Sequence, residues 1–298
     1  MKKTFIINGG AGRVVTSIPA LERYAMENPN EDFNIISHAW SEFYHGNRIL
    51  QDKVLNINEN IFKYIKDTEI VSPEPYYDND YINQRAHLIH AFDKAINGNT
   101  NLKQLPIPSL HVAYDEHVIV KNILNKIKEE KKRDKVLVFQ PYGSGIGIRN
   151  ERPFDGTYRS FDVDIALKLI YELSKKYVVI YFGEKEFYHP GDSYSVNMFD
   201  NHPDLRLYLT LISQCDYFLG CDSLGQHIAA SFNKPGTVVL GSTFKENVSY
   251  DHFKIYRNKH LPIYSPIRLC NSAAQDRINS YCMVHDEFDI ENILQTIP

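Results

Sequence analysis

Short apolar runs and longer amphipathic stretches alternate along most of the chain. An apolar run over residues 4–8 precedes a glycine-rich turn, apolar residues at helical spacing extend over 14–27, and a second apolar run covers 32–37. A short apolar run is typical of a buried parallel strand, whereas apolar positions three and four residues apart are typical of an amphipathic helix. The opening pattern therefore predicts strand, turn, helix and strand, which is how a doubly wound α/β fold begins.

The same alternation returns in the second half of the chain and predicts a second α/β unit of the same class. The predicted strands cover residues 135–140, 177–182, 217–221 and 237–240. The predicted helices cover residues 162–176, 204–215 and 225–232. Strands that alternate with helices in this way predict a parallel sheet with helices on its faces.

The pattern is weaker between these two halves. It predicts a helix over 79–96 and a charged amphipathic helix over 116–133, whose end mixes both signs of charge, as is typical of a solvated helix end before a linker. We place the domain boundary there, with an N-terminal Rossmann-like domain over 1–134 and a C-terminal one over 135–285. A final helix over 286–298 is expected to cross back to the first domain, as is common in two-domain folds of this type.

Composition narrows the class of protein. The 298 residues carry a net charge of -4, which gives no bulk attraction to nucleic acid or to an anionic membrane. The four cysteines, Cys215, Cys221, Cys270 and Cys282, show no C-x-x-C spacing, so we expect reduced packing residues of a cytoplasmic protein. No apolar run approaches the roughly 20 residues of a membrane span, so we expect no transmembrane segment.

The turn after the predicted strand 217–221 carries the first candidate chemistry. It places an acid, a hydroxyl, a glycine and a histidine where the next helix begins, namely Asp222, Ser223, Gly225 and His227. The free N–H groups and the dipole of a helix start favour negative charge, and phosphate above all. The alternative is a plain crossover whose polar turn only caps the helix.

A second turn, after the predicted strand 135–140, has the means to hold a diphosphate. Its candidates are Gly143, Ser144, Arg149 and Arg159. Main-chain N–H groups in a glycine turn, together with arginine side chains, commonly bind phosphate groups.

The glycine turn at the start of the chain contains Gly10, Gly12 and Arg13. A dinucleotide site has an acid at the end of the second strand, but His38 and Trp40 follow that strand here. We therefore expect no nicotinamide cofactor.

Two stretches resemble the ADP-heptose:lipopolysaccharide heptosyltransferase family. Asp222-Ser223, His227, Ala229-Ala230 and Pro235 resemble its nucleotide-sugar motif, D-[ST]-G-x-x-H-x-A-A followed by P, with Leu224 in place of the family's glycine. Residues 12–21 resemble its opening motif, G-D-[VI]-x-x-[TS]-[LI]-P-A-L, with Arg13 in place of the aspartate.

The resemblance implies a glycosyltransferase B architecture, with two Rossmann-like domains that face each other across a cleft. It implies a metal-independent enzyme with no cofactor, which moves a sugar from a nucleotide-diphosphate sugar to an acceptor hydroxyl. The donor would lie on the second domain, where Glu184 and Glu186 resemble the family's nucleoside-binding glutamate in G-x-x-x-E. The acceptor would enter near Gly10, Gly12 and Arg13.

The substitution at residue 13 bears on the general base. In the family the aspartate is the proposed base, whereas an arginine stays protonated near neutral pH and is suited to clamp a phosphate or a sugar acid. Since reactive groups gather at the carboxyl ends of strands, we expect the base among His38, Glu42 and Asp115, the last of which also suits a helix N-cap.

Several functions remain open from the sequence. A nucleotide-sugar epimerase could use the same fold and donor site, and the loss of the aspartate favours a binding module without catalysis. The acceptor is either a saccharide of a surface glycan or, as with some bacteriophage enzymes of this architecture, a hydroxymethylated base of phage DNA, which would have to be extruded from the duplex. The nucleotide, the sugar, the stereochemistry and the oligomeric state are left undetermined.

Overall fold

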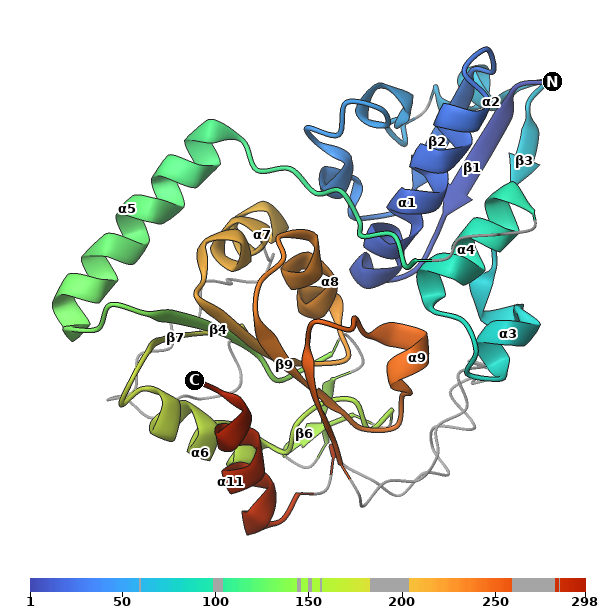
Figure 1. Ribbon diagram of the computed structural model, residues 1–298. Coiled ribbons are helices and arrows are strands. Elements are labelled where there is room, and N and C mark those ends of the chain that lie inside the picture. Colours follow the sequence, from blue (N-terminus) through green and yellow to red (C-terminus); the bar gives the residue numbers. More distant parts are fainter. Residues whose placement is uncertain are drawn as a thin grey trace. The chain divides into compact units, whose positions relative to one another are not determined.

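The computed structural model describes residues 1–58, 60–98, 104–143, 146–149, 152–155, 157–182, 204–258, 282–283 and 285–298. It divides into two compact units, Met1–His111 and Val112–Pro298. They are coloured from blue to teal and from green to red in Figure 1.

The first unit is a small parallel sheet with helices packed on it. Its strands are β1 (Lys3–Ile7), β2 (Phe33–Ser37) and β3 (Glu69–Val71), in the order β2-β1-β3. Its helices are α1 (Ala11–Glu27), α2 (Ile61–Ile65), α3 (Asn79–Ile82) and α4 (Leu88–Asn97), and 3₁₀ turns cover Ser41–Tyr44, Gln51–Lys53 and Pro75–Tyr77. The predicted opening of strand, turn, helix and strand is therefore present.

Aromatic packing fixes α1 on this sheet. The rings of Phe5, Tyr24 and Phe33 meet edge to face, with centroids 4.9, 5.7 and 5.3 Å apart. All three side chains are buried. The glycine turn before α1 is thereby held at the carboxyl end of β1.

The helix expected over residues 79–96 is two helices, so this prediction was wrong. Gln84 adopts a positive φ of 61° between α3 and α4, and a left-handed residue ends an α-helix. His87 begins the second helix, because its Nδ1 accepts a hydrogen bond from the N–H of Ile89 at 3.1 Å. Apolar periodicity continues across this break, which is why the sequence pattern did not reveal it.

The second unit contains the larger sheet. Its strands are β4 (Val136–Gln140), β7 (Val178–Tyr181), β8 (Tyr217–Cys221), β9 (Gly236–Leu240) and β10 (Lys254–Arg257), with a separate hairpin of β5 (Gly147–Arg149) and β6 (Arg152–Phe154). Its helices are α5 (Tyr114–Lys131), α6 (Val163–Leu173), α7 (Leu205–Gln214), α8 (Leu224–Ser231), α9 (Lys245–Val248) and α11 (Glu287–Thr296). The hairpin and β10 were not predicted.

The order of strands in this sheet creates a topological switch point. All neighbours are parallel, in the order β10-β9-β8-β4-β7. The chain leaves β4 towards β7 on one side and returns to β8 on the other. Ligands of open α/β sheets bind where the strand order reverses, beyond the carboxyl ends of the strands. Here that place lies between β4 and β8, whose last residues are aligned by the pairing of Gln140 with Gly220.

The helix α5 belongs to the second unit, although the sequence places the domain boundary after it at residue 134. The structure divides between His111 and Val112, because α5 packs against α7. Val120, Leu124 and Ile127 are buried on its inner face, and Arg206 of α7 binds Glu116 at 2.6 Å. The charged outer face dominates the sequence of this helix and conceals its role in packing.

The C-terminal helix α11 packs against α6, β9 and β10 within the second unit, and Figure 1 shows it in red beside α6. Its expected crossing to the first domain stays a prediction. Ile293 and Ile297 are part of the second unit's hydrophobic core. Tyr217 donates a hydrogen bond to the carbonyl of Thr296 at 3.0 Å, which fixes the end of the helix there. Within the described residues, no helix is long and apolar enough to span a membrane.

Candidate functional site

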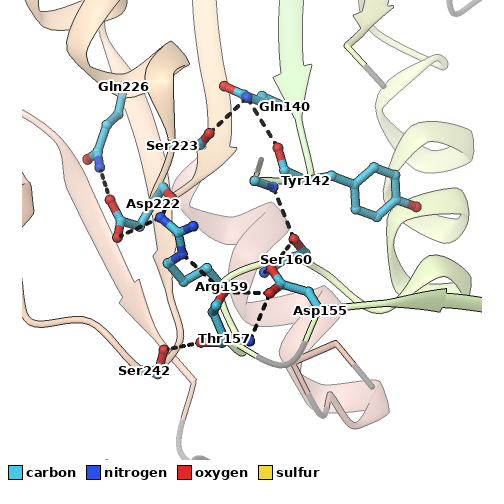
Figure 2. Close-up of polar contacts among 11 residues, drawn as sticks. Gln140, Tyr142, Asp155, Thr157, Arg159, Ser160, Asp222, Ser223, Gln226 and Ser242 are labelled. Carbon is cyan, nitrogen blue, oxygen red and sulfur yellow. Dashed lines mark hydrogen bonds and ion pairs between the residues drawn. The ribbon is translucent and has the colours of Figure 1, made fainter. Parts of the chain in front are cut away.

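Polar side chains from several elements meet at the switch point between β4 and β8 (Figure 2). Gln140 ends β4, and Asp222 and Ser223 follow β8. The loop that contains Thr157 and Arg159 adds a guanidinium to them. Residues from distant parts of the sequence therefore form one site in the second unit.

Gln140 organises the start of α8. Its Nε2 donates to Oγ of Ser223 at 3.1 Å, and its Oε1 accepts from the N–H of Gly225 and the hydroxyl of Tyr208, both at 2.8 Å. Ser223 occupies the N-cap position, but its side chain makes no capping hydrogen bond. The helix is thus capped from the neighbouring strand, and the N–H of Gly225, which we expected to face a ligand, is already bound.

Arg159 lies between the glycine turn after β4 and the turn after β8. Its Nε donates to Oγ1 of Thr157 at 3.1 Å, and its Nη1 donates to the carbonyl of Asp222 at 3.4 Å and lies 3.9 Å from the carboxylate Oδ2 of Asp222. A Cβ on Gly143 would be 3.7 Å from Nη2 of Arg159. Three residues that the sequence proposed, Gly143, Arg159 and Asp222, are therefore neighbours.

The N–H of Gly143 is also bound within the protein. It donates to Oγ of Ser160 at 3.0 Å. The glycine turn therefore offers an anion fewer free N–H groups than its sequence predicts. Among the described residues, Arg159 supplies positive charge at this edge.

Asp222 and Gln226 contribute acceptors to the same site. The amide Nε2 of Gln226 donates to Oδ1 of Asp222 at 2.8 Å, and both side chains are buried. In the part of the chain that the structure describes, Oε1 of Gln226 is buried without a hydrogen-bond partner. A buried acceptor of this kind is costly unless a ligand or water donates to it.

His227 is buried in α8 and does not act as a cation. Its Nδ1 lies 3.0 Å from the hydroxyl of Tyr250, and burial lowers the pKa of His227 to about 3. The ring is therefore neutral near physiological pH. It can serve an anion only as a hydrogen-bond donor.

Some predicted residues cannot be placed. Ser144, Glu184 and Glu186 lie outside the described residues. The backbone of Arg149 is in β5, but its side chain is not described.

Arg13 is held inside the first unit. Its guanidinium binds the carboxylate of Glu74, with Nη1 and Nη2 each 3.1 Å from an oxygen, and Nη2 donates to the carbonyl of Pro73 at 2.9 Å. It also lies over the rings of Tyr76 and Phe92. Only 10% of the side chain is exposed. The sequence suggested either a phosphate clamp or a solvated arginine, and the structure has instead an ion pair in which the arginine is buried and the glutamate is partly exposed.

The two glycines of that turn position α1. Gly10 is the N-cap residue, and its carbonyl accepts from the N–H of Arg13 at 2.9 Å. Gly12 lies in the first turn, where its carbonyl accepts from the hydroxyl of Thr16 at 2.9 Å.

The three candidate bases have different environments. His38 is exposed directly after β2, and Glu42 is half-buried in the 3₁₀ turn that follows. Asp115 is exposed in the first turn of α5, in the second unit, and the residues before this helix form no strand. The strand end that suggested Asp115 is therefore absent. Ala113 is the N-cap residue, so Asp115 does not cap the helix either.

The sequence did not identify Gln140, Gln226 or the loop residues Asp155, Thr157 and Ser160. An aspartate side chain often accepts a hydrogen bond from the backbone N–H two residues later, which forms an Asx turn. Asp155, two residues before Thr157, carried this local signal in the sequence. Nothing in the sequence indicates that Gln140 binds two residues that follow β8.

Comparison with known proteins identifies the fold. No family model matches the chain, and no curated protein matches it. Among solved structures, the glycosyl transferase family 9 protein from Veillonella parvula aligns with a TM-score of 0.68 at 10% identity, over 99% of this chain and 96% of that chain. ADP-heptose lps heptosyltransferase II from E. coli aligns with a TM-score of 0.61 at 14% identity, over 94% of this chain and 98% of that chain. The chain has the fold of the family 9 heptosyltransferases.

This fold is the glycosyltransferase B architecture, with two Rossmann-like domains. The E. coli heptosyltransferase WaaC, solved with ADP-2-deoxy-2-fluoro heptose, shares the heptosyltransferase fold with a TM-score of 0.52 at 10% identity, over 93% of this chain and 98% of that chain. The resemblance inferred from the two motifs is thereby confirmed at the level of the fold.

Proposed function

We propose that the protein is a glycosyltransferase that transfers a sugar from a nucleotide-diphosphate sugar to an acceptor hydroxyl. The observation that carries this proposal is the convergence of Arg159, Asp222 and Ser223 at the switch point of the second sheet. The heptosyltransferase fold of the whole chain supports it. A motif match alone would not, since the same motif could be an ordinary crossover.

The site suits a departing diphosphate. When the glycosidic bond to the donor breaks, negative charge develops on the phosphate oxygens, and preorganised positive groups stabilise it. Arg159 supplies a guanidinium whose side chain is 12% exposed, and the positive end of the α8 dipole lies beside it. Ser223 accepts from Gln140, so its hydroxyl can donate its own hydrogen to a phosphate oxygen.

The acceptors at the site suit sugar hydroxyls. Asp222 has a carboxylate that is buried apart from a small exposed fraction, and Gln226 holds this carboxylate through a hydrogen bond from its Nε2. A sugar hydroxyl can donate to such a carboxylate. The site thus combines a positive group for a diphosphate with an acceptor for a sugar hydroxyl.

The comparisons indicate which donors to test first. WaaC is solved both with ADP and with an analogue of ADP-heptose. ADP-sugars, including ADP-heptose, are therefore the first compounds to test, followed by UDP-, GDP- and CMP-sugars. A ligand that binds the folded state raises the melting temperature by mass action, so thermal shift ranks these donors.

Replacement of Arg159 tests the site. We expect Arg159→Met to weaken binding of the best donor by about 1.5–3 kcal/mol, the usual worth of a hydrogen bond to a charged group. Isothermal titration measures this loss. Arg133→Met is the matched control, because among the described residues the side chain of Arg133 donates to the carbonyls of Lys131 and Lys132, at the end of α5 and before β4, which is the opposite edge of the sheet. Unchanged affinity in Arg159→Met would show that the donor does not bind here.

A further inference from the structure

A fully buried carboxylate lies beneath the switch-point site. Asp155 is 0% exposed and accepts four hydrogen bonds. The N–H groups of Thr157 and Ser160 donate to it at 2.9 and 3.1 Å, and the hydroxyls of the same two residues donate to it as well. Asp155 therefore cannot contact a ligand itself.

Each of these two hydroxyls also accepts a hydrogen bond from a group of the site. Oγ1 of Thr157 accepts from Nε of Arg159 at 3.1 Å, and Oγ of Ser160 accepts from the N–H of Gly143 at 3.0 Å. A carboxylate can only accept, so the hydrogens of both hydroxyls point to Asp155 and their lone pairs point to the site. Figure 2 shows this arrangement, with Asp155 connected through Thr157 to Arg159.

The loop that carries these residues is fixed to the end of β9. The N–H of Ser242 donates to the carbonyl of Tyr158 at 3.4 Å, and the hydroxyl of Ser242 donates to the carbonyl of Thr157. Gly241 allows this close approach, because a Cβ there would lie 1.9 Å from the carbonyl oxygen of Tyr158. The loop is consequently attached to the sheet on both sides of the switch point.

We propose that Asp155 is a positioning residue for anion binding: through Thr157 it fixes the guanidinium of Arg159 in the orientation that receives a diphosphate. This inference rests on the proposed function, since it assigns the diphosphate to that site. An arginine held before the ligand arrives loses less side-chain entropy on binding, so the affinity for the ligand rises. The Thr157 hydroxyl is the link that transmits the orientation.

The test uses the full-length protein and inorganic pyrophosphate as the probe. Thr157→Val removes the hydroxyl and keeps the shape and the N–H that binds Asp155. We expect the affinity for pyrophosphate to fall about tenfold, which corresponds to one net hydrogen bond. Thr157→Ser keeps the hydroxyl and is expected to restore most of that affinity.

A matched control separates positioning from general loss of stability. Thr210 is also buried, and its hydroxyl donates to the carbonyl of Arg206 within α7. Thr210→Val should lower the melting temperature in the same way as Thr157→Val without changing the affinity for pyrophosphate. Parallel loss of affinity in both variants would contradict the positioning role.

A double-mutant cycle gives the decisive result. If Thr157 acts through Arg159, Thr157→Val should have no further effect on affinity in the Arg159→Met background. An equal loss of affinity in both backgrounds overturns the inference. Wild-type affinity in Thr157→Val, together with weak binding in Arg159→Met, also overturns the inference but leaves the proposed site standing. Wild-type affinity in Arg159→Met contradicts the proposed site itself.

Discussion

Arg13 shows how a residue at a motif position can have another role. It follows β1 in the first turn of α1, and its partner Glu74 follows β3, so the pair lies at the carboxyl edge where the order β2-β1-β3 reverses. A sheet of this kind binds ligands at such a place. In this chain the place holds an ion pair instead, and the guanidinium that could have met an anion is neutralised by Glu74.

The burial of His227 predicts how the free energy of unfolding depends on pH. The folded pKa of about 3 is below the unfolded value of about 6.5, so the folded state favours the neutral ring. This contribution to stability is complete above about pH 6.5 and is lost as the pH falls towards the folded pKa. The expected slope is about 1.4 kcal/mol per pH unit.

Denaturant titrations at a series of pH values measure that slope. His227→Asn cannot acquire this proton and retains an acceptor for the hydroxyl of Tyr250, which lies 3.0 Å from the ring nitrogen. Other titrating groups affect both proteins equally, so the difference between wild type and variant isolates His227. Equal slopes between about pH 6 and pH 4 would contradict a buried neutral histidine.

At the scale of elements, the start of α8 depends on contact with β4 more than on its own sequence. The N–H of Gly225 is bound to Oε1 of Gln140, and a Cβ on Gly225 would lie 2.4 Å from that oxygen and 2.4 Å from the hydroxyl of Tyr208. The glycine is therefore needed for packing, because any larger residue would push the helix away from the strand. The site depends on the same contact, since Gln140 also holds Ser223.

We expect Gly225→Ala to lower the free energy of unfolding by about 1–3 kcal/mol, the usual cost of overpacking. Gly147→Ala is the control, because no atom of the described part of the chain lies within 4 Å of its added Cβ. Chemical denaturation compares the two variants. If Gly225→Ala were as stable as Gly147→Ala, the close packing of α8 on Gln140 would be refuted.

The elements also show what the sequence could predict. The strands β1, β2, β4, β7, β8 and β9 were found, because each is a short apolar run bounded by turn residues. Asp222, Ser223 and Gly143 were proposed for the related reason that they follow such strands, and the structure places them at one sheet edge. Gln140 and Asp155 act through hydrogen bonds to residues far along the chain, and no periodicity or spacing reports those. The side of α5 that packs on α7 was hidden by its charged exposed face.

For the whole molecule, the sequence and the structure differ on where one unit ends and the next begins, at residue 134 or between His111 and Val112. The first unit closes its own aromatic core around Phe5, Tyr24 and Phe33. The second unit extends from α5 to α11, and its hydrophobic core includes Ile293 and Ile297 from the last helix. Both ends of the second unit are therefore part of its packing, and its stability depends on a helix that the sequence analysis placed in the N-terminal domain.

A pair of fragments tests this division. Val112–Pro298 retains α5, whereas a fragment that begins at Lys135 exposes the surface of α7 that α5 covers. Burial of Val120, Leu124 and Ile127 stabilises the unit by about 1.5–3 kcal/mol for each side chain. We therefore expect the longer fragment to unfold cooperatively and to bind pyrophosphate, and the shorter one to melt at a much lower temperature or to aggregate. Calorimetry of the two fragments decides, because equal melting temperatures would place the boundary after α5, where the charge pattern of the sequence put it.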